Sequence, residues 1–381
     1  MSTVKTAKKV LYELKKNGYE AYIVGGAVRD YLLRMPTTDV DITTNAKPFQ
    51  VGKVFKSIPT GLKFGTVTVV YGEEQFEVTT YRLDGDYLNH RHPEEVVYAE
   101  KVEDDVMRRD FTINGLLMNE KNEIFDYVEG KLDIERKLIR AIGDPMKRFE
   151  EDALRIMRAF YFQSKLGFQI DRDTRDAIEK SRHLLKEIAM ERILQEIIKM
   201  FKGPYLKRAL HSMITTKVHE VLPGLKEGIL KAVELDQMPY MDVFFTMSFY
   251  LNGSIPKEWP LSNKHKHRYE QSILLMHKKQ PFDALTLYTY GMELCMLANR
   301  ASFALGKAKL YTNQIEKDFK ELPIQSDMDL KIRPNDMMSI TSKKAGAWIK
   351  QLQTEMVEKV LLKQLINDKD ALTDYVKAHV K

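Results

Sequence analysis

Two aspartates separated by one residue, Asp39 and Asp41, are the side chains of this sequence best suited to hold a metal ion. Residues two apart in a strand project from the same face, so we expect both carboxylates on one side, with Val40 and Ile42 in the core behind them. Neighbouring carboxylates repel each other unless a cation lies between them, and a divalent metal is the usual solution. The simpler alternative is a strand end with polar residues.

The glycine pair Gly25-Gly26 lies shortly before these aspartates and is followed by Arg29. The pattern predicts a strand over residues 21–24, a glycine turn, and a short helix over residues 28–33. Free backbone N–H groups and the positive end of that helix would face an incoming anion, and the Arg29 guanidinium suits phosphate oxygens. Each part alone is a weak signal, but a metal-holding carboxylate pair beside a phosphate-binding turn predicts nucleotidyl transfer.

Alternating strands are expected after the aspartates, over residues 66–71 and 75–80, because apolar residues recur there with a period of two. A helix over residues 46–57 and a glycine-containing loop over residues 59–65 are expected before them. Glu77, in the second of these strands, is either a third carboxylate beside the aspartates or a residue that faces solvent.

Two adjacent arginines, Arg108 and Arg109, follow in the segment over residues 102–118. They cannot share one helix face, so we expect one at the site and the other in a structural ion pair. Arg109 is the one we expect to contact the triphosphate. Residues 84–95, which precede this segment, are polar and rich in turn formers, so they predict a mobile loop.

Strand patterns nearly vanish beyond Gly143-Asp144-Pro145, and the first helix past this break carries charged residues. Glu151, Asp152, Arg155 and Arg158 are spaced to fall on one stripe of that helix. One interpretation is a ladder of ion pairs. The other is that an aspartate and an arginine present acceptors and donors to the flat edge of cytosine or adenine, whereas guanine and uracil show the wrong pattern.

The composition limits the class of protein. The chain has 381 residues, is 44% hydrophobic and carries a net charge of +6, which favours two or more domains and a polyanionic partner. The one cysteine, Cys295, excludes an internal disulfide framework and fits a reducing cytoplasm. No apolar run of about 18 residues is present, so no membrane span is expected, and residues 1–16 predict an amphipathic helix.

Together these segments resemble the bacterial class II tRNA nucleotidyltransferases, the CCA-adding enzymes, within the polymerase-β-like nucleotidyltransferase superfamily. The matching segments are Gly25-Gly26-Ala27-Val28-Arg29-Asp30, Asp39-Val40-Asp41, residues 60–69, Arg108-Arg109-Asp110-Phe111-Thr112-Ile113-Asn114, residues 148–155 and Glu191-Arg192-Ile193. In order and spacing this set is specific, and it covers residues 4–201. The resemblance returns over residues 322–324 and 342–348.

The resemblance implies an α+β fold, with a nucleotidyltransferase head that holds a small mixed sheet and an all-helical remainder. The implied regions are a head at 1–145, a neck at 146–203, a body at 204–320 and a tail at 321–381. It implies addition of C, C and A to the 3′ end of tRNA from CTP and ATP. The implied roles are Mg²⁺ on Asp39 and Asp41, catalysis by these two with Arg109, triphosphate binding by Gly25, Gly26, Arg29 and Arg109, and base recognition by Asp152 and Arg155 with Glu151 and Arg158.

The sequence departs from the family pattern at a few positions. Tyr161 stands where a third arginine is common, one turn after Arg158, and Gly115 replaces a small alanine. His92 replaces the second arginine of the loop implicated in the switch from C to A addition. Because that loop is retained, full CCA addition is favoured over a poly(A) polymerase or a partial CC- or A-adding enzyme. A non-catalytic RNA-binding protein would be expected to lack a carboxylate at Asp39 or Asp41.

Basic runs in the helical part are candidates for tRNA phosphate contacts, or else solvated faces. They are Lys264-His265-Lys266-His267-Arg268, Lys278-Lys279 and Lys343-Lys344. Lys343 and Lys344 are the preferred pair because they precede an expected helix start, where N–H groups face outward. Contacts of this kind suit recognition of the acceptor arm and elbow by shape. Whether the protein is a monomer or a homodimer is left open.

Overall fold

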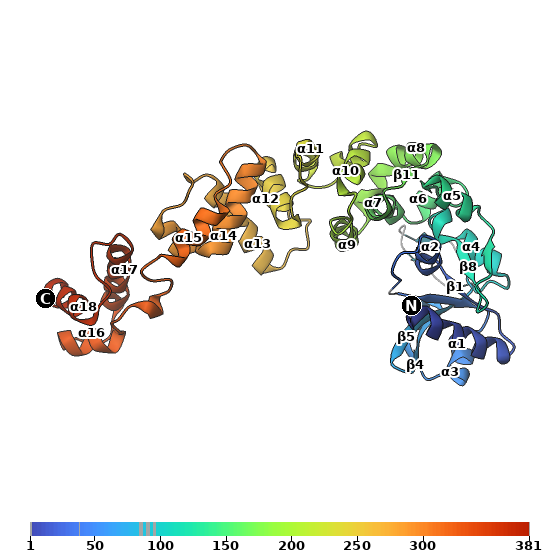
Figure 1. Cartoon of the computed structure of the whole chain (residues 1–381), viewed down its shortest axis with the longest axis horizontal. Coiled ribbons are helices and arrows are strands. Elements are labelled where there is room, and N and C mark those ends of the chain that lie inside the picture. The colour runs from blue at the N-terminus through green and yellow to red at the C-terminus, as the bar shows by residue number, and fades with distance from the viewer. Residues whose placement is uncertain (1, 38, 84–86, 89–91, 94–96, 381) are drawn as a thin grey trace. The chain divides into compact units, whose positions relative to one another are not determined.

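The structure is a computed structural model that describes residues 2–37, 39–83, 87–88, 92–93 and 97–380. The chain divides into two compact units, Met1–Leu222 and Pro223–Lys381, and each is described here by itself (Figure 1). The expected boundaries at 145, 203 and 320 stay predictions, and the division between the units falls within the expected body.

A mixed sheet forms the centre of the first unit, and its strands follow the order β3-β4-β5-β2-β1-β8-β9. Its strands are β1 (Ala21–Val24), β2 (Asp41–Thr44), β3 (Ser57–Gly61), β4 (Thr66–Tyr71), β5 (Glu74–Thr80), β8 (Leu116–Met118) and β9 (Ile124–Asp126). Strands β2 and β5 pair in parallel, whereas β1 pairs antiparallel with both β2 and β8. The α+β class with a small mixed sheet is therefore confirmed.

Helix α1 (Ser2–Lys16) covers the sheet with one apolar face. Ala7, Val10, Leu11 and Leu14 are fully buried, at the spacing of one helical stripe. Further helices of this unit are α2 (Gly26–Leu32), α3 (Pro48–Val54), α4 (Val102–Met107), α5 (Gly130–Arg136), α6 (Pro145–Glu151), α7 (Leu154–Leu166), α8 (Arg172–Ser181), α9 (Met190–Met200) and α10 (Leu206–Thr215). The predicted amphipathic helix at the N-terminus is confirmed.

Local expectations differ from the structure in several places. The helix expected over residues 46–57 is only α3, because Ser57 already begins β3 on the sheet edge. The loop expected over residues 59–65 continues that strand and then forms a 3₁₀ turn, Leu62–Phe64, which we label η1. The predicted mobile loop lies largely outside the described residues, which include there only β6 (Tyr87–Leu88) and β7 (His92–Pro93).

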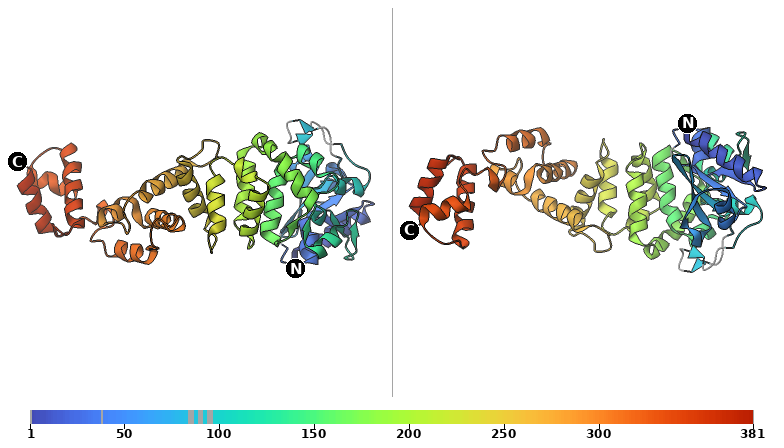
Figure 2. Two further views of the ribbon diagram at one scale, coloured as in Figure 1. Left: turned by 90° about the horizontal axis from the view of Figure 1, so that it is seen from above. Right: turned by 90° about the horizontal axis from the view of Figure 1, so that it is seen from below.

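The described residues of the second unit form helices joined by turns and loops, with no strand among them. Its helices are α11 (Lys226–Glu234), α12 (Met241–Asn252), α13 (Asn263–Met276), α14 (Ala284–Ala304), α15 (Thr312–Lys320), α16 (Pro334–Thr341), α17 (Ala347–Leu361) and α18 (Lys369–His379). Helices α16, α17 and α18, red in Figure 2, contribute to one apolar core that includes Met337, Met356 and Val376. The expectation of an almost all-helical remainder is confirmed.

Candidate active site

The pairing of β1 with β2 brings the aspartates to the glycine turn. Val24 is the register partner of Asp41, so the turn that begins at Gly25 lies at the same end of the sheet. Asp39 and Asp41 are exposed, whereas the intervening Val40 is buried, and Ile42 is buried as well. The structure thus confirms the expected alternation, although Asp39 precedes the strand rather than belonging to it.

Negative charge accumulates around Asp41. Glu77 on β5 is the register partner of Asp41 on β2, so its carboxylate is the neighbour that the sequence left open. Desolvation by the surrounding protein raises the pKa of Asp41, Glu77 and Asp39 add to the increase, and Arg109 opposes it. A carboxylate whose pKa is raised by burial and by neighbouring carboxylates marks a place where a cation is favourable. Within the described residues no group of three or more potential metal ligands is found, so the candidate ligand set is the aspartate pair.

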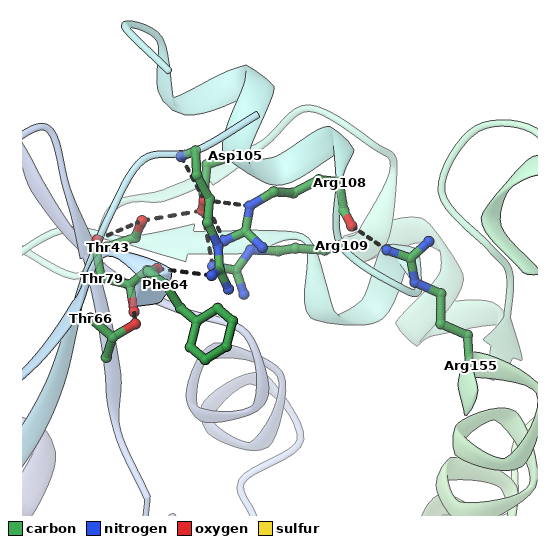
Figure 3. A network of polar contacts seen from close by, with 9 residues as sticks. Thr43, Phe64, Thr66, Thr79, Asp105, Arg108, Arg109 and Arg155 are labelled. Carbon is green, nitrogen blue, oxygen red and sulfur yellow. Dashed lines mark hydrogen bonds and ion pairs between the residues drawn. The ribbon is translucent and has the colours of Figure 1, made fainter. Parts of the chain in front are cut away.

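Both arginines of the adjacent pair bind one carboxylate, that of Asp105 on α4 (Figure 3). Arg108 donates to Oδ1 of Asp105 at 2.6 Å, and Arg109 donates to Oδ2 at 3.0 Å. Burial alone would raise the pKa of Asp105, but Arg109 and Arg108 outweigh it and hold the pKa below its ordinary value. The expected division into one site arginine and one structural arginine is therefore incomplete, because Asp105 lies within one helical turn of both.

Arg109 nevertheless faces the glycine turn. Its Nη1 atom lies 3.5 Å from the position that a Cβ would take on Gly25. Its Nε is buried and has no hydrogen-bond acceptor among the described residues. A buried donor without an acceptor is costly and points to a missing partner. The guanidinium of Arg109 thus lies beside the glycine turn, and its positive charge also acts on the Asp41 carboxylate.

Gly25 supplies a backbone conformation that other residues rarely adopt, with φ 73° and ψ −131°. Its carbonyl accepts the first hydrogen bonds of α2, from the N–H groups of Val28 and Arg29. The N–H groups of Gly26 and Ala27 precede those bonds, at the position where a helix leaves donors unsatisfied. The turn therefore leaves backbone donors available, and its binding of an anion stays a prediction.

Arg29 differs from its expected place, because its guanidinium is turned inward. The residue is only 2% exposed, and it donates to Asp30 Oδ1 from Nε at 2.9 Å and from Nη2 at 2.7 Å. It also donates to Asn114 and lies over the ring of Phe162, with 5.1 Å between the guanidinium carbon and the ring centroid. In this arrangement Arg29 has no free face for a phosphate, and it braces the turn instead.

A buried carboxylate, Asp110, connects the sheet region with α7. Arg158 donates to its Oδ2 at 2.7 Å, and Asn114 and the Phe111 amide donate to its Oδ1 at 2.9 Å and 2.8 Å. Burial would raise the pKa of Asp110, but Arg158 and these hydrogen bonds hold it below its ordinary value. Since Asn114 also accepts from Arg29, one hydrogen-bonded chain runs from the glycine turn to Arg158.

The expected single helix through the base-recognition residues is wrong, because the chain breaks at Asp152. Helix α6 ends at Glu151, Asp152 has φ −145° and ψ 98°, and α7 begins at Leu154. Oδ1 of Asp152 accepts from the Leu154 amide at 3.1 Å, and Oδ2 accepts from Arg192 at 3.0 Å. The side chain of Asp152 therefore competes successfully with the helical backbone and cannot share a continuous stripe with Arg158.

Arg155 and Glu151, which were expected on the same helical stripe as Asp152, are bound to protein groups. Arg155 donates to Glu151 at 2.8 Å and to the carbonyl of Arg108 at 2.8 Å, the second contact being drawn in Figure 3. Arg192, on α9, has an Nη1 atom that is buried without an acceptor among the described residues. The residues around Asp152 thus combine an ordered carboxylate with an unused donor.

Comparison with known proteins agrees with this arrangement. The Poly A polymerase head domain matches residues 21–140, the probable RNA and SrmB-binding site of polymerase A matches residues 167–229, and a putative tRNA nucleotidyltransferase domain 2 matches residues 243–376. The CCA-adding enzyme of Bacillus cytotoxicus is 36% identical over 391 aligned positions, which cover 99% of this chain and 98% of that protein. The chain belongs to the CCA-adding enzyme family.

Solved structures support the same family. A crystal structure of the Bacillus stearothermophilus CCA-adding enzyme in complex with CTP matches with a TM-score of 0.83 and 31% identity, over 98% of this chain and 96% of that one. The Thermotoga maritima CCA-adding enzyme complexed with tRNA-CCA shares the fold, with a TM-score of 0.66 and 17% identity over 98% and 94% of the two chains. The protein is therefore a nucleotidyltransferase of this family.

Of Asp105 and Asp110, two buried carboxylates that bind arginines, the sequence could have revealed the partners of only the first. Asp105 stands three and four residues before Arg108 and Arg109, a spacing that signals ion pairs on a helix. The partnership of Asp110 with Arg158 spans 48 residues and has no local signal.

Lys343 and Lys344 lie exposed before α17, as expected, and the Lys344 carbonyl accepts from the Trp348 indole at 3.0 Å. Within the described part of the chain, every helix is too short or too polar to cross a membrane.

Proposed function

We propose that the protein adds C, C and A in turn to the 3′ end of tRNA, using CTP and ATP and releasing pyrophosphate. The observation that carries the proposal is the meeting of the aspartate pair, the Gly25 turn and Arg109 at one end of the sheet. Carboxylates for a metal and donors for a phosphate chain are the parts that nucleotidyl transfer needs.

Asp39 and Asp41 would hold Mg²⁺. Their oxygen donors suit a hard cation, which commonly keeps waters and substrate phosphates as its other ligands when only two carboxylates bind it. Burial raises the pKa of Asp41, and Glu77 and Asp39 raise it further, so a cation bound there would stabilise the charged carboxylate. When bound, Mg²⁺ would lower the pKa of the attacking hydroxyl and neutralise charge on the phosphates.

The chain's own residues would bind and orient the triphosphate. The amides of Gly26 and Ala27 are placed for its oxygens, and Arg109 would lend positive charge from the opposite side. Asp105 keeps Arg109 in place through the contact at 3.0 Å. Arg29 would act through Asn114 and Asp110 as a positioning residue, since its guanidinium is buried.

Selection between nucleotides would depend on Asp152 and Arg155, with Glu151 as the partner of Arg155. Arg158, on the same helix as Arg155, is held by Asp110. An ordered aspartate can accept from the exocyclic amine of cytosine or adenine, and an arginine can donate to a ring nitrogen or carbonyl. Arg192 holds Asp152 at 3.0 Å, which fixes the direction of its carboxylate. Base choice would thus be made by protein groups without a template strand.

The test uses purified protein, tRNA lacking its 3′ CCA, and labelled CTP and ATP. We expect a product extended by C, C and A. A long A tail would instead identify a poly(A) polymerase, and arrest after two cytidines would identify a CC-adding enzyme.

The metal assignment has a separate test. Asp39→Ala and Asp41→Asn should abolish incorporation and leave tRNA binding nearly unchanged. Asp173→Asn, on the exposed face of α8, is the matched control and should retain activity. Near-normal turnover by Asp41→Asn would overturn the assignment.

A further inference from the structure

A pocket of about 580 Å³ in the second unit is lined by four lysines and no carboxylate. Its lining residues come from the end of α13 and the segment after it, from the last turn of α14, and from the segment before α15. Figure 1 labels these three helices. The lining residues are Met276, Lys278, Lys279, Gln280, Ser302, Gly306, Lys307, Ala308, Lys309 and Tyr311. Such a pocket concentrates positive charge.

Within the described part of the chain, no carboxylate forms an ion pair with the lysines of this pocket, although, after the hydrogen bonds from Thr286, the charge of Lys278 helps to lower the pKa of the nearby Asp283. Among the described residues, none of its lysines has a carboxylate oxygen within 4.0 Å of its Nζ atom. Elsewhere in the same unit, Lys320 pairs with Glu316 at 2.6 Å, and Lys317 approaches Glu321 at 3.9 Å. The nearby Asp283 instead caps α14, where it accepts from the Thr286 amide at 2.7 Å. Converging ammonium groups repel one another, so an anion in the pocket would be stabilised.

A buried polar network holds the two lysine-bearing segments in place. The amide of Asn299, which is fully buried, donates to Gln280 Oε1 at 2.6 Å and to the Lys309 carbonyl at 3.0 Å. Its Oδ1 accepts from the Tyr311 amide at 2.8 Å. Gln280 in turn donates to the hydroxyl of the buried Ser302 at 2.9 Å. The pocket is therefore built before any ligand arrives, which reduces the entropy cost of binding.

The lysines form two pairs with different surroundings. Lys278 lies near Thr286 Oγ1, at 3.4 Å, and Lys307 donates to the Tyr250 hydroxyl and lies 4.5 Å from the centroid of that ring. Lys279 and Lys309 are exposed, with no hydrogen-bond partner for their ammonium groups among the described residues. The second pair is thus free to contact a ligand and can be changed with little risk to the fold.

We propose that this lysine pocket binds consecutive backbone phosphates of the tRNA substrate. The inference rests on the proposed function for the identity of the RNA, but the charge and order of the pocket stand without it. Ammonium groups act as point charges toward phosphate oxygens, whereas no arginine is present to read a base edge. The contact would therefore fix the position of the tRNA without sequence preference, separately from Lys343 and Lys344.

The test compares two charge-matched variants of the full-length protein by binding labelled tRNA that lacks its 3′ CCA. Lys279→Gln with Lys309→Gln removes the two free charges of the pocket. Lys317→Gln with Lys320→Gln removes two charges of the same unit that have carboxylate partners. Each lost phosphate contact lowers the slope of log affinity against log salt concentration by about 0.7–0.9, so two lost contacts should lower it by about 1.4–1.8. The pocket variant should then bind tRNA about 15- to 30-fold more weakly near 0.15 M salt.

The outcomes separate the pocket from the catalytic proposal. A weaker, less salt-dependent affinity and a higher KM for tRNA at unchanged kcat, seen only in the pocket variant, support the inference. Equal affinities of the two variants overturn it. A second experiment uses inorganic phosphate as the ligand. If phosphate binds the wild type but not the pocket variant, while both proteins bind tRNA equally well, the pocket binds a free anion. That result overturns the assignment to RNA. Failure of wild-type protein to extend tRNA would refute the proposed function while the binding comparison still decides the pocket.

Discussion

Replacement of Asp110 by asparagine should destabilise the first unit through loss of one buried charge. Asp110 Oδ2 accepts from Arg158, and the side chain of Asp110 is 9% exposed. Removal of one partner from a buried ion pair costs about 3–5 kcal/mol. The Arg158 side chain is 34% exposed, so water can partly solvate its charge when the partner is lost. We therefore expect Asp110→Asn to lower the free energy of unfolding by about 2 kcal/mol.

Urea unfolding can assign this loss to the first unit. Both tryptophans, Trp259 and Trp348, belong to the second unit, so their fluorescence reports that unit alone. Asp110→Asn should shift the transition seen by far-UV circular dichroism and leave the fluorescence transition in place. Asp173→Asn, an exposed aspartate of the same unit, should shift neither.

The pH dependence of stability tests the Asp110–Arg158 ion pair independently, because its direction follows from the pKa of Asp110. The native pKa of Asp110 is held below its ordinary value, so its contribution to stability is complete above the unfolded pKa of about 3.9 and is lost as pH falls toward the native pKa. The difference between wild type and Asp110→Asn should be constant above about pH 5 and narrow below about pH 4. The reasoning is refuted if Asp110→Asn costs as much in an Arg158→Gln background as in the wild type, because the pair would then contribute nothing.

Three further outcomes are expected. Gly25→Ala should strain the backbone by about 1–3 kcal/mol and raise the KM for CTP and ATP, whereas Gly18→Ala, also at positive φ but with open space around it, should leave KM unchanged; equal KM values for the two variants would contradict the role of the turn. Arg192→Gln removes the donor to Asp152 and should reduce discrimination against UTP and GTP roughly tenfold in single-nucleotide incorporation, since a hydrogen bond to a charged group contributes about 1.5–3 kcal/mol; unchanged selectivity would contradict the base-recognition assignment. Burial raises the pKa of the Cys295 thiol to about 12, so a thiol reagent at mildly alkaline pH should modify it only on unfolding, and rapid reaction of the native protein would show that the site opens.

Local patterns in the sequence were sufficient to predict which side chains of a strand or helix face the core and which face outward. The two-residue period placed Asp39 and Asp41 outward and Val40 and Ile42 inward, and the structure agrees. The helical period placed Val10, Leu11 and Leu14 in the core. These predictions succeed because side-chain direction in a strand or helix depends on the backbone geometry of that element alone.

Partner choice among charged groups was decided by tertiary structure. Arg29 was expected at the phosphate, yet it donates to Asn114, a residue 85 positions away, as well as to its neighbour Asp30. The second oxygen of Asp152 likewise accepts from Arg192, which lies 40 positions further along the chain. A buried charge takes whichever partner packing brings within reach, because leaving it unpaired would cost several kcal/mol.

The sequence by itself therefore determined the family, the outward direction of the two aspartates, the glycine turn and the helical character of the remainder. Only the tertiary structure decided that Arg29 braces the turn, that Asp110 binds Arg158, and that four lysines from two separate segments converge on one pocket. The physical reason is that periodicity is a property of neighbouring residues, whereas ion pairs and pockets are made by residues that the fold brings together.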